Sequence, residues 1–183
     1  LESHGGEAET QLFGGDAIAG GSQLSLLSAS AVCTAIAIIG YGCKWQTLED
    51  AIRKETAKAD TVYVVTGAAF EKVGESRSVT WILPQGEITS NTNKKCPVPN
   101  YYWKVLLKVK RDSDGKVKSA SSVGFWFEHK SYKDTGKKFS DEEFVVSVDQ
   151  IEQWTGFDFF VNVPDSYEGT AEANDSWSVF QSF

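Results

Sequence analysis

Methionine is absent from the 183-residue chain, and histidine and cysteine are scarce, with two and three copies. The three cysteines, Cys33, Cys43 and Cys96, have no CxxC spacing. With so few histidines beside them, a structural zinc site is not expected. The cysteines are either buried or free thiols, or they form one disulfide and leave one thiol, in a pairing that the sequence leaves open. An odd count remains compatible with an exported protein that carries one bridge.

Long hydrophobic runs are also missing. The longest, Ala31–Ile39, suits a buried strand or a short helix. It is much shorter than the roughly 20 apolar residues that a membrane-spanning helix needs, so no membrane association is expected. The chain starts at Leu1 without a signal peptide, which predicts a mature or trimmed product.

Basic residues are absent from both ends of the chain. Residues 1–43 and 139–183 contain no Lys or Arg, so all 18 basic residues lie in 44–138. The net charge of −7 argues against a purely electrostatic nucleic-acid binder, which would be basic overall. The middle segment is positively charged, because its basic residues outnumber its acids, and this keeps a local basic face possible.

The chain after residue 43 carries clear secondary-structure patterns. Lys44–Ala59 repeats apolar residues at helical spacing and predicts a helix. The β-branched run Thr61–Thr66 predicts a buried central strand, and Ser78–Leu83 predicts another strand. Two longer β-rich runs, Tyr101–Arg111 and Val117–Glu128, flank an Asp-Gly turn and predict a hairpin.

The C-terminal part begins with a helix signal. Residues 147–150 read Ser-Val-Asp-Gln, a capping box that predicts a short helix through Trp154, with Gly156 as its stop. The tail from Asp165 is acidic and polar until Trp177. Because few helices separate the strands, we expect an α+β fold with a mixed, mainly antiparallel sheet and flanking helices. The length predicts a single domain over 1–183, in which residues 1–30 are poorly patterned.

Three lysines of the first hairpin arm share one face. Lys104, Lys108 and Lys110 occupy alternate positions, and alternate side chains of a strand point the same way. One interpretation is a solvated sheet face, which antiparallel sheets commonly have. The other is a surface that contacts the phosphates of a nucleic acid.

Five segments occur in the order of one known family. They are Trp45–Glu49, Tyr63–Gly67, Pro97–Val105, Gly124–Phe127, and Ser147–Phe160 with Asn162, Pro164 and Asp165. Read together, they resemble the DNA/RNA non-specific endonucleases, which carry a ββα-metal finger. The resemblance spans about Ser30 to Glu168. It implies that the α+β fold is a ββα-metal finger nuclease scaffold.

The resemblance also implies a chemistry. A family member hydrolyses phosphodiester bonds of DNA and RNA without sequence preference, with a histidine as general base on water. One divalent cation, usually Mg²⁺, sits on a helix asparagine and on phosphate oxygens. Here Glu49 stands where the family has a carboxylate that orders the waters of that cation, and His4 is the candidate base. Export to the periplasm or outside the cell is implied as well.

The chain departs from the family pattern at the base and at the metal. The family's Asp-Arg-Gly-His is matched by the stretch around His4. If His4 takes the histidine position, the Asp, Arg and Gly are missing, and if Gly5 takes the glycine position, Gly6 replaces the base. Its Asn-x-x-Pro-Gln is matched by Ala31–Ala35, and its metal-binding asparagine by Tyr41. The predicted site is therefore His4 and Glu49 as catalytic residues, Glu49 at the metal, and Lys104, Lys108 and Lys110 on nucleic acid.

These departures leave alternatives open. The chain is either a degenerate relative that binds nucleic acid or a protein, or a chain whose N-terminal segment is incomplete or wrongly assigned, or an enzyme whose site is rebuilt from other residues. An interaction module that uses the acidic ends of the chain is a further hypothesis.

Overall fold

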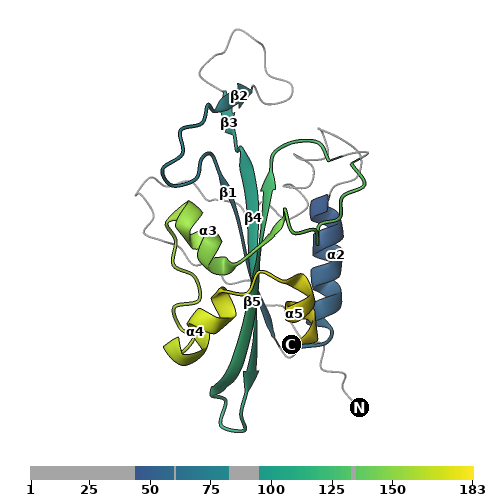
Figure 1. Cartoon of the computed structure of the whole chain (residues 1–183), viewed down its shortest axis with the longest axis vertical. Coiled ribbons are helices and arrows are strands. Elements are labelled where there is room, and N and C mark those ends of the chain that lie inside the picture. The colour runs from purple at the N-terminus through teal and green to yellow at the C-terminus, as the bar shows by residue number, and fades with distance from the viewer. Residues whose placement is uncertain (1–43, 60, 83–94, 133–134) are drawn as a thin grey trace.

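The computed structural model describes residues 44–59, 61–82, 95–132 and 135–183. Helices and strands follow one another along these ranges (Figure 1). In chain order they are α2 (Lys44–Thr56), β1 (Val62–Ala69), β2 (Thr80–Ile82), β3 (Cys96–Val98), β4 (Tyr101–Arg111), β5 (Val117–Glu128), β6 (Val145–Val146), α3 (Val148–Thr155), α4 (Asp165–Glu172) and α5 (Trp177–Ser182). The predicted α+β class with a mainly antiparallel sheet is confirmed. Residues 1–30, which are poorly patterned in the sequence, lie outside the described ranges.

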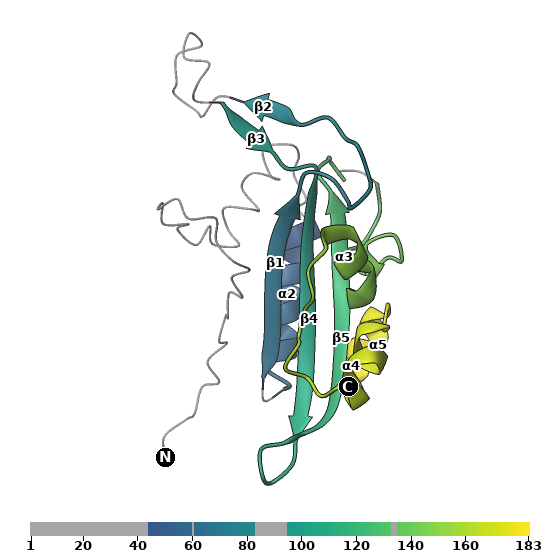
Figure 2. The same cartoon turned by 90° about the vertical axis from the view of Figure 1, so that its left-hand side faces the viewer.

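The main sheet has four antiparallel strands in the order β1-β4-β5-β6. The strands β2 and β3 form a separate two-stranded ribbon, which extends beyond one end of the main sheet (Figure 2). The β4–β5 hairpin has the predicted bounds and pairs Tyr101 with Glu128 at its open end. Its turn is fixed by Asp112, whose carboxylate accepts the backbone N–H groups of Asp114 and Lys116.

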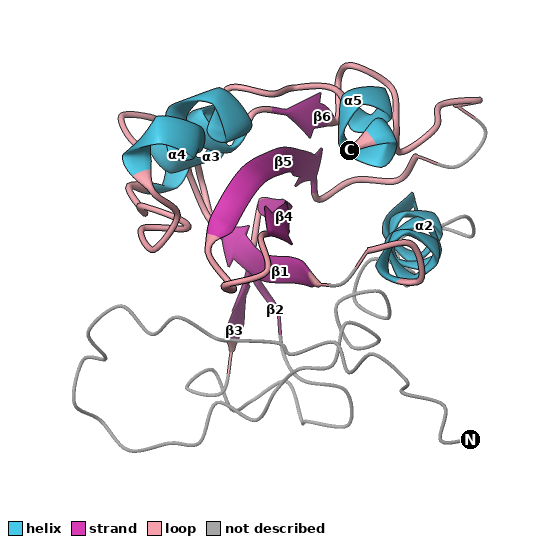
Figure 3. Ribbon diagram, turned by 90° about the horizontal axis from the view of Figure 1, so that it is seen from below, coloured by secondary structure: helices cyan, strands magenta, loops and turns pink. Residues whose placement is uncertain are grey.

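Helices cover both faces of the main sheet. Figure 3 shows α2 and α5 on one side and α3 and α4 on the other. On the α2 side, Tyr102 and Leu106 pack with Trp45 of the helix. On the α3 side, Trp103 and Val105 pack with residues such as Ile151. Because β4 is buried on both faces, it carries apolar residues in both of its alternating sets.

The predicted central strand is wrong in its position. β1 pairs with β4 alone among the described strands, so it lies at an edge of this sheet and is only half-buried. The long strands β4 and β5 take the central places. A β-branched run indicates that the side chains of a strand are packed against other residues, but it does not indicate how many strands flank that strand. The predicted strand over Ser78–Leu83 shortens to β2.

The helix α3 begins and ends where its capping signals predict. The hydroxyl of Ser147 accepts the backbone N–H of Gln150 at 3.1 Å. At the other end Gly156 adopts a φ of 73°, and its N–H donates to the carbonyl of Glu152. This left-handed conformation suits glycine, which has no Cβ.

The acidic tail folds into α4 and α5, which the sequence patterns do not predict. Both helices are too short to be stable alone, so they depend on packing against the rest of the protein. α5 contributes Trp177 and Phe180 to the α2 side of the core, where Phe180 is fully buried. α4 buries Ala171, whose carbonyl accepts the hydroxyl hydrogen of Ser122 at 2.8 Å.

Gly67 leaves the space that the indole of Trp103 occupies on the neighbouring strand. A Cβ at Gly67 would come within 2.2 Å of Trp103 Cζ2, and the indole is itself buried against Phe159. We expect Gly67→Ala to lower the free energy of unfolding by about 1–3 kcal/mol, because the ring has to move. Chemical denaturation followed by tryptophan fluorescence measures this loss.

The matched control for Gly67→Ala is Gly169→Ala in α4. A Cβ at Gly169 meets nothing within 4 Å, so this substitution relieves a helical glycine and is expected to stabilise the protein slightly. Equal denaturation midpoints for the two variants would contradict the argument.

Candidate functional site

Glu49 lies on the buried face of α2, against the sheet. Trp45 precedes it by one helical turn, and Trp45 Nε1 donates a hydrogen bond to Glu49 Oε1 at 2.8 Å. The carboxylate side chain is largely buried, and the tryptophan is fully buried. The Trp45-x-x-x-Glu49 spacing therefore does two things: it anchors the helix in the core, and it fixes the orientation of the carboxylate.

Lys104 approaches the same carboxylate from β4. Its Nζ lies 3.7 Å from Glu49 Oε1 and 4.6 Å from the centre of a Trp45 ring. It also donates a hydrogen bond to Thr66 Oγ1 on β1 at 2.8 Å. Trp45, Glu49, Thr66 and Lys104 form one polar cluster, here called the Glu49 cluster. Thr66 is exposed, so the cluster lies just below the protein surface.

Lys108 forms a second buried pair beside the first. Its Nζ contacts Glu55 Oε2 at 3.0 Å and the carbonyl oxygen of Phe180 at 2.9 Å. Burial would raise the pKa of Glu55, but hydrogen bonds from Lys58, Lys108 and Gln181 outweigh it and lower that pKa to about 2. The carboxylate therefore stays charged inside the protein.

The predicted solvated lysine face is wrong for two of its three members. Lys104, Lys108 and Lys110 do share one face of β4, but α2 and α5 cover that face, and Lys104 and Lys108 are buried. The pattern of the strand cannot show that α2 supplies Glu49 and Glu55 to pair with them. Lys110 is exposed and lies over the ring of Phe183. Nucleic-acid binding by these lysines stays a prediction, and Lys110 alone has its side chain at the surface.

The other predicted site residues are outside the described ranges. His4 lies there, and so do Tyr41, Cys33 and Cys43. Cys96 is exposed on β3. Of the predicted catalytic and metal residues, only Glu49 is placed by the structure.

The described residues around Glu49 do not fit a directly bound divalent cation. Hard cations such as Mg²⁺ need several oxygen ligands. Glu49 offers one carboxylate, whose Oε1 already faces an indole N–H and the ammonium of Lys104. The arrangement does fit a carboxylate that is held in place to accept hydrogen bonds from bound water.

A second group of acids, which the sequence patterns do not reveal, lies on the other side of the sheet. One carboxylate oxygen from each of Asp149, Glu152 and Glu172 lies within 4.8 Å of the others. The first two residues share a face of α3, and Glu172 ends α4. Burial and negative neighbours raise the pKa of Glu172 to about 8. The i,i+3 spacing of Asp149 and Glu152 is visible in the sequence, but the approach of Glu172 is not.

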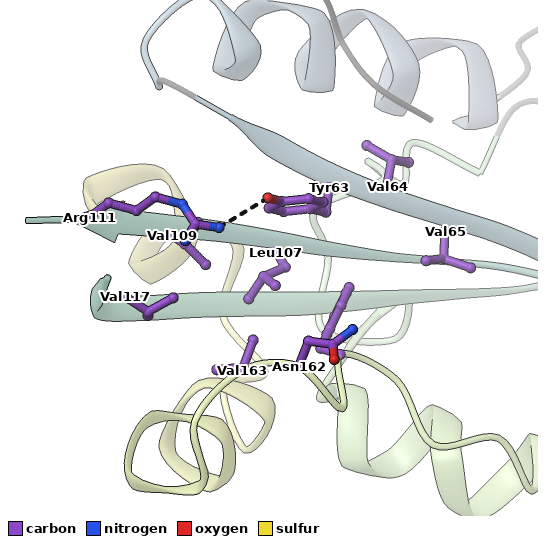
Figure 4. Close-up of a pocket in the computed structure, with 10 residues that line it drawn as sticks. Tyr63, Val64, Val65, Leu107, Val109, Arg111, Val117, Asn162 and Val163 are labelled. Atoms are coloured by element: carbon purple, nitrogen blue, oxygen red, sulfur yellow. Dashed lines mark hydrogen bonds between the residues drawn. The ribbon is translucent and has the colours of Figure 1, made fainter. Parts of the chain in front are cut away.

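An apolar pocket lies between β1, β4 and the segment before α4 (Figure 4). Valines and Leu107 make up much of its lining, and the guanidinium of Arg111 contacts the hydroxyl of Tyr63 at 3.4 Å at one end. Arg111 is the one charged residue among the lining residues. Such a surface is a poor match for a phosphodiester, and it contains none of the predicted site residues.

Known proteins resemble the part of the chain that contains the Glu49 cluster. The family model described as DNA/RNA non-specific endonuclease matches residues 40–166. A protein of Serratia marcescens named "Nuclease" is 27% identical over 131 residues, which are 70% of this chain and 41% of that protein. The chain thus spans about two fifths of the length of this relative. Within the ranges that the structure describes, no helix has the length and hydropathy to cross a membrane.

Proposed function

The chain belongs to the DNA/RNA non-specific endonuclease family, and from this premise we propose that it cleaves phosphodiester bonds of DNA and RNA in a reaction that depends on a divalent cation. Mg²⁺ is the proposed cation, and nucleic acids without sequence preference are the proposed substrates. Export to the periplasm or outside the cell is part of the same proposal.

One observation supports the proposal most directly. Three of the five family-like segments meet in the Glu49 cluster: Trp45 and Glu49 come from α2, Thr66 from β1 and Lys104 from β4. Segments far apart in the sequence thus serve to hold one carboxylate. Burying a charge is costly unless it is fully partnered, so these contacts are what keep the Glu49 carboxylate in the core.

Within this proposal, Glu49 is a positioning residue. Trp45 and Lys104 lock its carboxylate, and Thr66 locks the ammonium of Lys104. No step is assigned to the cation, because the described donors around Glu49 do not fit its direct binding. Its ligands and the general base belong, on this proposal, with residues outside the described ranges.

Plasmid nicking tests the function. Supercoiled plasmid is incubated with the protein and Mg²⁺, with and without a chelator. We expect nicking that the chelator abolishes. Glu49→Gln keeps the shape of the side chain but removes its charge, and we expect a rate about 10–100-fold lower, as for other residues that support a metal-bound group.

The control for Glu49→Gln is Asp50→Asn, the next residue on α2. Asp50 is exposed and pairs with Arg53, so its change should leave nicking unaltered. Circular dichroism and thermal unfolding of both variants separate a lost function from a lost fold. A wild-type protein that never nicks plasmid under these conditions would remove the enzymatic proposal.

The second candidate function is binding without cleavage. The departures from the family pattern around His4, at Ala31–Ala35 and at Tyr41 favour it. Its expected result is a plasmid retained on the protein, with an affinity that falls as salt rises, and not nicked. Lys110→Glu is the cleanest charge reversal for this case, because Lys110 is the exposed member of the lysine set. A partner protein in place of nucleic acid would leave plasmid binding undetectable.

A further inference from the structure

Asp149, Glu152 and Glu172 converge from two helices on the side of the sheet opposite Glu49. Asp149 lies in the first turn of α3, and Glu152 follows one turn later on the same face. Glu172 is the last residue of α4. One carboxylate oxygen from each residue lies within 4.8 Å of the other two. Three carboxyl groups thus share a space small enough for one ion.

No described side chain of opposite charge pairs with this group. Among the ion pairs of the described residues, none includes Asp149, Glu152 or Glu172. The charges that act on Glu172 come from Glu152, Glu168, Asp149 and Asp158, and all of them are negative. The segment 139–183, which contains all three acids, has no Lys or Arg of its own.

Glu172 supplies a second, independent sign that a partner is missing. Its side chain is 94% buried, as its exposed fraction is 6%. The Oε1 atom is buried and has no hydrogen-bond partner. Buried polar atoms in proteins are nearly always paired, and a buried carboxylate without a partner is strongly unfavourable.

We propose that Asp149, Glu152 and Glu172 bind a divalent cation, with Ca²⁺ preferred over Mg²⁺, which fastens α4 to α3. All ligand atoms are carboxylate oxygens, the donors of hard cations. Glu152 Oε1 accepts the backbone N–H of Phe159 at 2.6 Å, so the other oxygen is available to the ion. Glu172 lies beyond the matched residues 40–166, and the site is therefore not supplied by the family match.

Coordination number and rigidity carry the preference for Ca²⁺. Calcium accepts irregular sets of six to eight oxygens at about 2.3–2.6 Å, so water can complete a set that begins with three carboxyl groups. Mg²⁺ demands a near-ideal octahedron at about 2.0–2.1 Å, which side chains from two separate helices do not readily supply.

Thermal unfolding of the full chain with and without added CaCl₂ tests the site. We expect 1 mM CaCl₂ to raise the Tm of the chelator-treated protein by several degrees, because an ion that binds only the folded state stabilises it. The same concentration of MgCl₂ should raise it less. Isothermal titration with CaCl₂ gives the stoichiometry, expected to be one ion per chain at this site.

Glu172→Gln is the decisive variant. It should weaken Ca²⁺ binding at least tenfold and remove the Tm response, because an amide cannot supply a charged ligand. Glu168→Gln changes a neighbouring acid of α4 outside the group and should keep the full response. Glu49→Gln should also keep it, so failure of the nuclease proposal and failure of the cation site are distinguishable.

Three outcomes would overturn the proposal. One is a wild-type Tm that calcium does not shift at millimolar concentration. Another is a shift that persists in Glu172→Gln. The third, an equal response to MgCl₂ and CaCl₂, would overturn the preference for Ca²⁺.

Discussion

Glu55→Gln is expected to lower the free energy of unfolding by about 3–5 kcal/mol, the cost of removing one partner from a buried ion pair. The carboxylate is 1% exposed and contacts Lys108, which is itself 4% exposed. After the substitution, the ammonium of Lys108 stays buried with the carbonyl of Phe180 and the Phe180 ring as its remaining contacts. A buried cation without a counter-charge is strongly unfavourable.

Urea denaturation of Glu55→Gln measures the loss, and Glu143→Gln is the matched control. Glu143 pairs with Lys137 at the surface, where both side chains are about two fifths exposed. Removing that pair should change the stability by less than about 1 kcal/mol. The double variant Glu55→Gln with Lys108→Met should be more stable than Glu55→Gln alone, because no buried charge remains. A single variant as stable as the wild type would contradict the role assigned to the pair.

Acid should destabilise the protein through the same residue. The pKa of Glu55 is about 2 in the folded protein, against an ordinary value of 4.5 in an unfolded chain. The unfolded state therefore binds the proton more readily, and stability falls as the pH falls. The contribution is fully present well above pH 4.5 and is lost as the pH drops through about 2. At ~1.36 kcal/mol per pKa unit, the loss is on the order of 3 kcal/mol.

The pH dependence is measured as the difference between wild type and Glu55→Gln in urea denaturation at several pH values. Other carboxylates, such as Glu75 and Glu128, also have lowered pKa values and add their own acid dependence to both proteins. The difference isolates Glu55: it should be large at neutral pH and shrink toward pH 2. A difference that stays constant with pH would show that Glu55 does not titrate as described.

The parts of the fold that could be predicted from the sequence are those with local signals. The β4–β5 hairpin has an Asp-Gly turn between two β-rich runs, and α3 has a capping residue at each end. The turn and the helix caps depend on residues that are close together in the sequence, so the local sequence pattern is enough to predict them. α4 has no side-chain cap, and α5 has only its N-cap Ser176, whose hydroxyl accepts the N–H of Val179. Both helices depend on the burial of Ala171, Trp177 and Phe180.

The parts that could not be predicted depend on which elements meet. The alternation of Lys104 and Lys108 correctly placed them on one face of β4, but it could not show that α2 covers that face. The Lys108–Glu55 contact joins residues 53 positions apart. A lysine on a strand usually faces water, and only the tertiary structure shows the buried acid that reverses this expectation.

In the candidate sites, too, some residues could be predicted from the sequence and others could not. Glu49 could be found because the segment around it resembles a family motif. The approach of Glu172 to Asp149 and Glu152 could not, because two helices have to pack on the sheet before the carboxylates meet. The sequence does show that 139–183 contains no Lys or Arg, so this segment offers these acids no basic side chain as a partner.

The position of α5 beside α2 also sets the order in which the core closes during synthesis. Trp45 and Phe125 leave the ribosome well before Trp177 and Phe180, the residues that complete their side of the core. Until α5 emerges, Trp45 and Phe125 lack the part of the core that Trp177 and Phe180 supply, and exposed apolar surface of this kind favours aggregation. The last described helix therefore closes the α2 side of the core.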